Sequence, residues 1–153
     1  MQLADLMATS VMAVTPAATV ADAARRMIER DTGVAVVMDE GELVGVISER
    51  DILRVVSEGA AGETPVGERM TRHVLTGTPT TTLPEALAIM VQGRFRHLPV
   101  VDAGRVVGMV SMRDLMAWTS QRLQRRGMGE IEDDELDTAE LVATIHQMRT
   151  GAN

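Results

Sequence analysis

The sequence has no cysteine, no tyrosine, one tryptophan and one phenylalanine among its 153 residues. Without cysteine the chain cannot rely on disulfide bonds, which is typical of reducing compartments, so we expect a cytoplasmic protein. Single-stranded nucleic acids are bound on aromatic stacking surfaces, which are nearly absent here. The net charge of -7 also disfavours contacts with nucleic-acid phosphates. We therefore expect no nucleic-acid partner.

The sequence also lacks long apolar runs and a basic-then-apolar leader. Its apolar runs are too short to cross a bilayer, so we expect no membrane contact. Abundant features are short aliphatic side chains and 12 methionines, within a composition that is 45% hydrophobic. This length and composition suit one compact domain, or two small halves that share a core.

The chain contains an internal repeat. A shift of 63 residues aligns residues 15–51 with residues 78–114 without a gap. Chance rarely keeps turn and polar residues in register over this length, so the pattern indicates a duplication. The identical pairs include Thr15 and Thr78, Pro16 and Pro79, Thr19 and Thr82, Asp39 and Asp102, Gly41 and Gly104, and Ser48 and Ser111.

A helix is predicted near the start of each repeat. Thr19 with Asp22, and Thr82 with Glu85, have the spacing of a capping box, which satisfies free N–H groups at a helix start. Apolar residues then recur at helical spacing, so one face of each helix should be buried. These residues are Val20, Ala23, Ala24, Met27 and Ile28 in the first copy, and Leu83, Ala86, Leu87, Met90 and Val91 in the second.

A β-hairpin and a second helix follow in each copy, because two short apolar runs flank a turn that contains glycine. The predicted strands are residues 11–14, 34–38 and 43–47 in the first repeat, and residues 74–75, 98–101 and 106–110 in the second. The apolar positions of the second helix are Ile52, Leu53 and Val56 in the first repeat, and Leu115 and Met116 in the second. A single β-α-β-β-α unit leaves one sheet face exposed. We therefore predict an α+β fold in which two such repeats pack sheet to sheet about a pseudo-twofold axis.

The predicted organisation has three parts. Residues 1–60 hold the first repeat and the start of a linker, residues 61–118 hold the second repeat, and residues 119–153 form an acidic linker with a C-terminal amphipathic helix. The terminal helix is indicated by a capping-box spacing at Asp137 and Glu140, followed by apolar residues at helical spacing.

The most informative motif is Gly-x-x-Ser-x-Arg-Asp, at residues 45–51 and again at residues 108–114. At a strand-to-helix junction, its Ser hydroxyl and Asp carboxylate belong to the same first turn. A carboxylate can accept both hydroxyls of a ribose, and a helix start favours a nearby phosphate. The glycine would permit close backbone approach to such a ligand. The same spacing also fits a plain capping box, so the motif alone leaves both interpretations open.

The paired repeats resemble a tandem of cystathionine-β-synthase-type (CBS) domains, called a Bateman module, over roughly residues 3–118. The resemblance rests on GVISERD, GMVSMRD and the stretch RHLPVVD at residues 96–102. It implies a regulatory or sensing module whose ligand is an adenine nucleotide (AMP, ADP or ATP), NAD or S-adenosylmethionine, with no required cofactor. It also implies a homodimer, and output through dimer geometry or a regulated protein partner.

The resemblance implies two clefts between the repeats. In each, the Asp would hold ribose hydroxyls, and the Ser beside it would contact ribose or phosphate. One cleft would join Ser111 and Asp114 to Thr32, Gly33 and Val34. The other would join Ser48 and Asp51 to Phe95, Arg96 and His97. Thr15 and Thr78 would lie beside the adenine base of the ligand. Arg94, Arg96 and His97 favour the second cleft for a polyphosphate, whereas a purely local hydrogen bond for His97 stays open.

Catalysis is not expected. The chain has no cysteine nucleophile, no Walker loop or dinucleotide glycine turn, and three histidines without metal-ligand spacing. Two other functions remain open: a protein-interaction scaffold with non-binding clefts, and, less favoured, a small enzyme that uses the carboxylates as bases.

Overall fold

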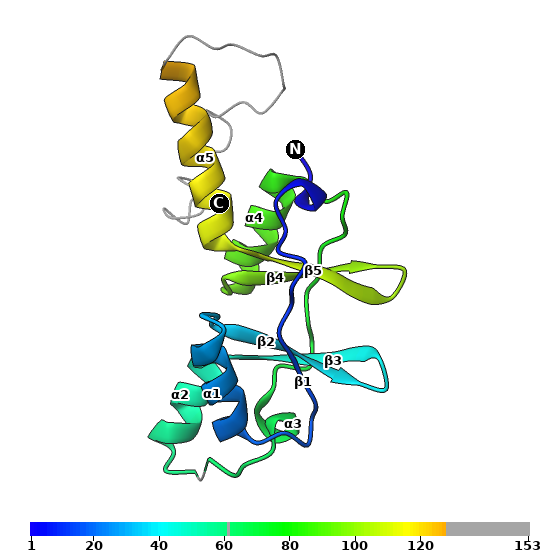
Figure 1. Ribbon diagram of the computed structural model, residues 1–153, viewed down its shortest axis with the longest axis vertical. Coiled ribbons are helices and arrows are strands. Elements are labelled where there is room, and N and C mark those ends of the chain that lie inside the picture. The colour runs from blue at the N-terminus through cyan, green and yellow to red at the C-terminus, as the bar shows by residue number, and fades with distance from the viewer. Residues whose placement is uncertain (61, 128–153) are drawn as a thin grey trace.

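The computed structural model describes residues 1–60 and 62–127, which form two similar halves (Figure 1). The first half contains β1 (Ala13–Val14), α1 (Val20–Glu29), β2 (Val34–Asp39), β3 (Glu42–Ser48) and α2 (Glu49–Ser57). The second contains α4 (Leu83–Gly93), β4 (His97–Asp102), β5 (Arg105–Ser111) and α5 (Met112–Gly127). Two short helical turns, η1 (Leu3–Asp5) and α3 (Val66–Arg69), precede the repeats.

The two sheets face each other at the middle of the molecule, with helices on their outer sides (Figure 1). The first sheet has the order β1-β2-β3 and the second has β4-β5. Strands β3 and β5 touch across the interface. The predicted α+β architecture of two repeats packed sheet to sheet is therefore confirmed.

The hairpins form where the sequence predicts them. Each turn places two residues at positive φ, Glu40 and Gly41 in the first copy and Ala103 and Gly104 in the second. Both hairpins also carry a register irregularity at equivalent places, between Val37 and Met38 and between Val100 and Val101. The duplication thus extends to backbone detail.

The first strand of the second repeat is an exception. Residues 74–75 were predicted to form it, yet neither is a strand residue, and Leu75 is 53% exposed. Pairing is limited to one parallel bridge between Gly77 and Val100, where Gly77 occupies the position of Val14 in the first copy. Glycine forms strands poorly, which accounts for the shorter pairing.

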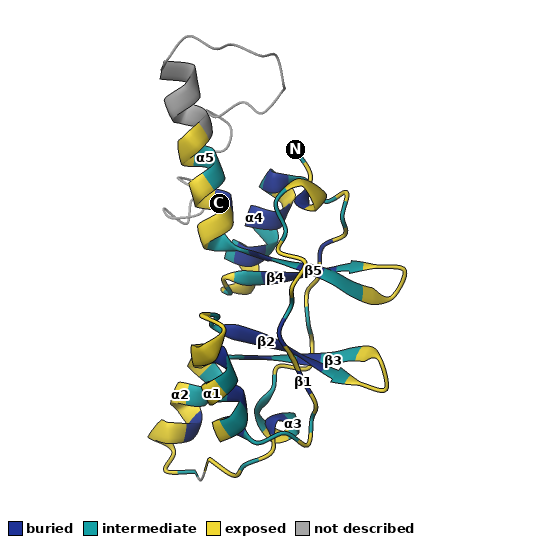
Figure 2. Ribbon diagram, viewed as in Figure 1, coloured by how far each residue is buried: buried dark blue, intermediate teal, exposed yellow. Residues whose placement is uncertain are grey.

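Each repeat has its own aliphatic core, and most predicted helix positions lie in it. Met27 and Met90 are 4% and 0% exposed at equivalent places on α1 and α4. Ile28, Leu53 and Val56 were expected on buried faces and are instead 82%, 66% and 67% exposed. Figure 2 shows this contrast, with most of β2 buried and with α2 and the coloured part of α5 largely exposed. Among the residues that the structure describes, none covers these apolar side chains.

The segments before each repeat cross to the opposite repeat, which the sequence did not predict. Leu3 is fully buried in the core of the second repeat, beside Leu83 and Leu98. Its N–H donates to the Thr81 carbonyl over 2.9 Å. Val66, 63 residues later, is fully buried in the core of the first repeat. This exchange ties the two halves together.

Helix α5 continues to Gly127, beyond residue 118, where the sequence places the end of the second repeat. The first residues of the predicted acidic linker therefore belong to a helix. The predicted amphipathic helix near residues 137–148 lies outside the described residues.

Candidate functional site

Both Ser-x-x-Asp motifs form capping boxes at strand-to-helix corners. The N–H and hydroxyl of Ser48 donate to Oδ2 of Asp51 over 2.9 and 2.7 Å. The same groups of Ser111 donate to Oδ2 of Asp114 over 2.8 and 2.6 Å. The capping interpretation of the motif therefore holds at both corners, and it uses only one oxygen of each carboxylate.

The second carboxylate oxygen differs between the two corners. Oδ1 of Asp51 lies 3.6 Å from Nη1 of Arg54, and the Asp51 side chain is 12% exposed. Asp114 is exposed, and its Oδ1 accepts no hydrogen bond from the side chains that the structure describes, those of residues 1–60 and 62–121. Capping therefore orients the Asp114 carboxylate while leaving one oxygen available to a ligand.

A cavity of about 810 Å³ lies beside Asp114, between the two repeats. We call it the Asp114 cleft. Its size is within the usual range for small-molecule sites, about 300–1,000 Å³. Its lining comes from the Ser111 corner, from the loop and strand at Thr32, Gly33 and Val34, and from the segment before β1, including Ser10, Val11 and Met12.

A second cavity, the Asp51 cleft, has a volume of about 230 Å³. It joins Ser48 and Asp51 to Phe95, Arg96 and His97. The structure thus brings together both sets of residues that the family resemblance pairs across the repeats. The volume of the Asp51 cleft lies below the usual range for a drug-sized ligand.

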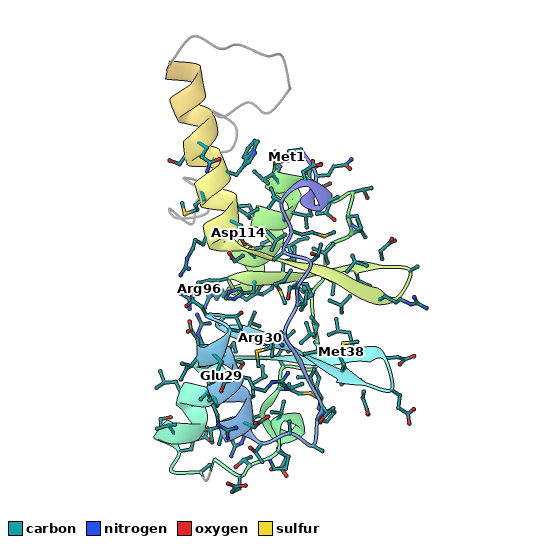
Figure 3. The ribbon with its side chains drawn as sticks, viewed as in Figure 1. Met1, Glu29, Arg30, Met38, Arg96 and Asp114 are labelled. Carbon is teal, nitrogen blue, oxygen red and sulfur yellow. The ribbon has the colours of Figure 1, made fainter. Side chains whose placement is uncertain are left out.

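The two clefts share one wall, whose residues line both cavities: Gly33, Val34, Glu49, Arg96 and His97. Arg96 and His97 were expected only in the Asp51 cleft, so this expectation was incomplete. Figure 3 shows Arg96 at the level between the repeats, with Asp114 above it. Nη2 of Arg96 lies 2.7 Å from Oε1 of Glu49, which forms an ion pair at the shared wall.

The structure does not place Thr15 or Thr78 in the lining of either cleft. Both are exposed, and the Thr78 N–H is occupied by Oγ1 of Thr81 over 2.8 Å. Residues 10–12 and 73–75, related by the same 63-residue shift, line the clefts instead. Matches at Val11 with Val74 would have extended the repeat backwards and indicated these segments.

The motif glycines make room for protein and not for a ligand. A Cβ on Gly45 would lie 2.6 Å from Sδ of Met70 and 3.0 Å from the Thr71 carbonyl oxygen. A Cβ on Gly108 would lie 2.5 Å from Sδ of Met7. The predicted approach of a ligand to these glycines is therefore wrong, because the crossing segments occupy that space.

His97 is half-buried at the shared wall. Burial lowers the pKa of its imidazole, and the nearby Arg96 guanidinium lowers the pKa further, while Glu49 and Asp114 act in the opposite direction. The neutral form of His97 is therefore favoured in the folded protein. A phosphate in either cleft would favour the protonated form.

Fold and clefts together define a two-repeat module with a ligand-sized cavity between its halves. The CBS domain family model matches residues 3–58 and 66–120, and the chain belongs to this family. The CBS domain-containing protein YhcV of Bacillus subtilis is 38% identical over 112 residues, which span 72% of this chain and 80% of YhcV.

Solved structures of CBS-domain proteins share the fold. The CBS domain protein PAE2072 from Pyrobaculum aerophilum, complexed with AMP, is 27% identical with a TM-score of 0.71, over 74% of this chain and 89% of that one. The CBS domain pair of protein MJ0100, in complex with 5′-methylthioadenosine and S-adenosyl-L-methionine, is 25% identical with a TM-score of 0.73, over 77% and 98%.

Among the described residues, no group of three acidic or histidine side chains could hold a metal ion, and no helix could span a membrane.

Proposed function

We propose that this protein is a regulatory module that binds an adenosyl ligand, of the AMP or S-adenosylmethionine class, in the Asp114 cleft. The observation that carries the proposal is the cavity of about 810 Å³ beside a carboxylate with one oxygen still available. Related CBS proteins crystallised with AMP and with S-adenosyl-L-methionine support the ligand class.

In this proposal the ribose hydroxyls donate to Asp114. Ser111 already holds Oδ2 of that carboxylate, so the ligand meets a group whose orientation is fixed before binding. Val11 and Met109 offer apolar surface for the base in a cleft whose lining contains no Phe, Tyr or Trp. Arg113 and Arg96 offer positive charge to a phosphate.

The size difference between the clefts decides which one we propose. The sequence favoured the Asp51 cleft for a polyphosphate, because Arg94, Arg96 and His97 were expected to set it apart. Arg96 and His97 line both clefts, so these two residues do not separate them, and only Arg94 is confined to the Asp51 cleft. The volumes of about 810 and 230 Å³ favour the Asp114 cleft for a nucleoside.

In this proposal, ligand binding would change the geometry of a dimer or the contact with a protein partner. Ile28, Leu53, Val56 and Met116 are apolar side chains that are 60% or more exposed. Leu53 and Met116 occupy equivalent positions of the two repeats, on α2 and α5. A homodimer that covers these residues is part of the proposal, and a ligand would act by binding one arrangement better than another. We propose a regulatory and not a catalytic output, in the cytoplasm.

The test is isothermal titration calorimetry with AMP, ADP, ATP, NAD and S-adenosylmethionine on the wild type, Asp114→Asn and Asp51→Asn. Asparagine keeps the shape and one cap acceptor. Loss of a hydrogen bond to a charged group should weaken binding in Asp114→Asn by about tenfold or more, while Asp51→Asn stays within about twofold. Equal affinity in both variants would contradict ribose binding by Asp114. No binding of any ligand to the wild type would favour the interaction scaffold.

A further inference from the structure

One ion pair separates the two clefts. Arg96 and Glu49 approach to 2.7 Å, and both side chains line both cavities. The two side chains are 60% and 61% exposed. Exposed pairs of this kind are weak, so an anion that enters a cleft can take Arg96 away from Glu49.

This pair breaks the pseudo-twofold symmetry. The 63-residue shift puts Met112 at the position of Glu49 and Gly33 at the position of Arg96. The Glu49 carboxylate lies close above Gly33, where a Cβ would come within 3.1 Å of its Cδ. The symmetric positions carry no charge, so the negative charge that Glu49 places at the wall shared by both clefts has no counterpart from the second repeat.

The net charges of the two clefts differ because of charged residues that line only one of them. The Asp114 cleft is lined by Arg30, Arg96 and Arg113 and by Asp31, Glu49 and Asp114. The Asp51 cleft is lined by Arg50, Arg54, Arg94 and Arg96 and by only two acids, Glu49 and Asp51. The larger cleft is therefore balanced, and the smaller one has an excess of positive charge.

The balanced charge of the Asp114 cleft limits how much negative charge the ligand can carry beyond its ribose. Here the inference rests on the proposed function, in which Asp114 is engaged by the ribose. Ribose hydroxyls are neutral, so Asp114 keeps its charge, and three arginines remain balanced by three carboxylates, which leaves room for little added negative charge. A triphosphate would bring several more charges toward these acids.

We propose that Glu49 is the residue that sets ligand specificity in the Asp114 cleft. By pairing with Arg96 and by its own charge, it restricts the cleft to adenosyl ligands whose tail carries no more than one phosphate. A diphosphate or triphosphate is disfavoured because it must approach the Glu49 carboxylate to reach Arg96.

The test compares adenosine, AMP and ATP by isothermal titration calorimetry, in magnesium-free buffer, on the wild type, Glu49→Gln and Glu29→Gln. Glu29 is exposed on α1 and lines neither cleft, although its neighbours Ile28 and Arg30 line the Asp114 cleft, so its variant removes the same charge nearby without altering a lining side chain (Figure 3). Thermal melting of each variant checks that it folds.

In Glu49→Gln we expect adenosine affinity to stay within about twofold, AMP affinity to rise about threefold and ATP affinity to rise about tenfold or more. These gains should shrink in high salt, which screens exposed charges. Glu29→Gln should bind like the wild type, which should itself prefer AMP to ATP.

Tighter binding of ATP than AMP to the wild type would overturn the inference. So would a constant ratio of ATP to AMP affinity in Glu49→Gln, or equal gains in Glu29→Gln. In each of these cases the proposed function survives, because AMP still binds. If no ligand binds to any of the three proteins, the proposed function fails and this inference fails with it.

Discussion

Leu3→Ala tests the exchange of segments between the repeats. Leu3 is fully buried among residues of the second repeat, although its chain continues directly into the first. The substitution removes buried side-chain atoms and leaves the backbone bonds to Thr81 and Pro79 in place. Leu→Ala changes in cores cost about 2–5 kcal/mol, so we expect a loss of about 3 kcal/mol in the free energy of unfolding.

For a chain of this size, each kcal/mol shifts the melting temperature by about 2–4 °C, so the expected drop is about 6–12 °C. Circular dichroism melts and urea titrations would measure it. Leu75→Ala is the matched control, because Leu75 is 53% exposed and its loss should cost about 0.5 kcal/mol or less. Equal melting temperatures for the two variants would refute the idea that the crossing segment helps hold the two halves together.

The same variant bears on ligand binding. Ala8, Ser10 and Val11 belong to the segment that Leu3 anchors, and they line the Asp114 cleft. A loosened anchor should therefore weaken AMP binding in Leu3→Ala, while Leu75→Ala keeps the affinity of the wild type for that cleft.

Three other predictions concern acidity, packing and assembly. Burial lowers the pKa of His97 below its ordinary 6.5, so the unfolded chain binds that proton more readily than the folded chain. The free energy of unfolding should therefore fall as the pH drops below about 6.5. In urea titrations between about pH 5 and 7.5, His97→Gln should make this fall smaller. Gly45→Ala should lower the melting temperature more than Gly108→Ala, because its new Cβ meets the Thr71 carbonyl as well as a flexible methionine. Leu53→Glu should shift sedimentation from dimer to monomer, and an unchanged sedimentation coefficient would argue against the α2 face as the dimer contact.

Local pattern was enough to predict the elements. Capping spacings, helical periodicity and glycine turns are set by residues close in the chain, so the helices at Thr19 and Thr82 and both hairpins form as expected. The pairing of each Ser-x-x-Asp corner with the opposite repeat came from the family resemblance. The sequence did not show that Gly77 would reduce a strand to one bridge, since the effect depends on neighbours in the sheet.

By itself, the sequence determined the duplication, the order of helix, hairpin and second helix in each repeat, and the two Ser-x-x-Asp corners. Only the tertiary structure decided that Leu3 is buried in the core of the second repeat and Val66 in the core of the first. It also decided that Arg96 and Glu49 belong to a wall shared by two clefts of unequal volume. The physical reason is the distance along the chain between the residues that interact. Caps, turns and periodicity act between neighbours along the chain, whereas cleft volume and charge depend on which distant side chains the packed sheets bring together.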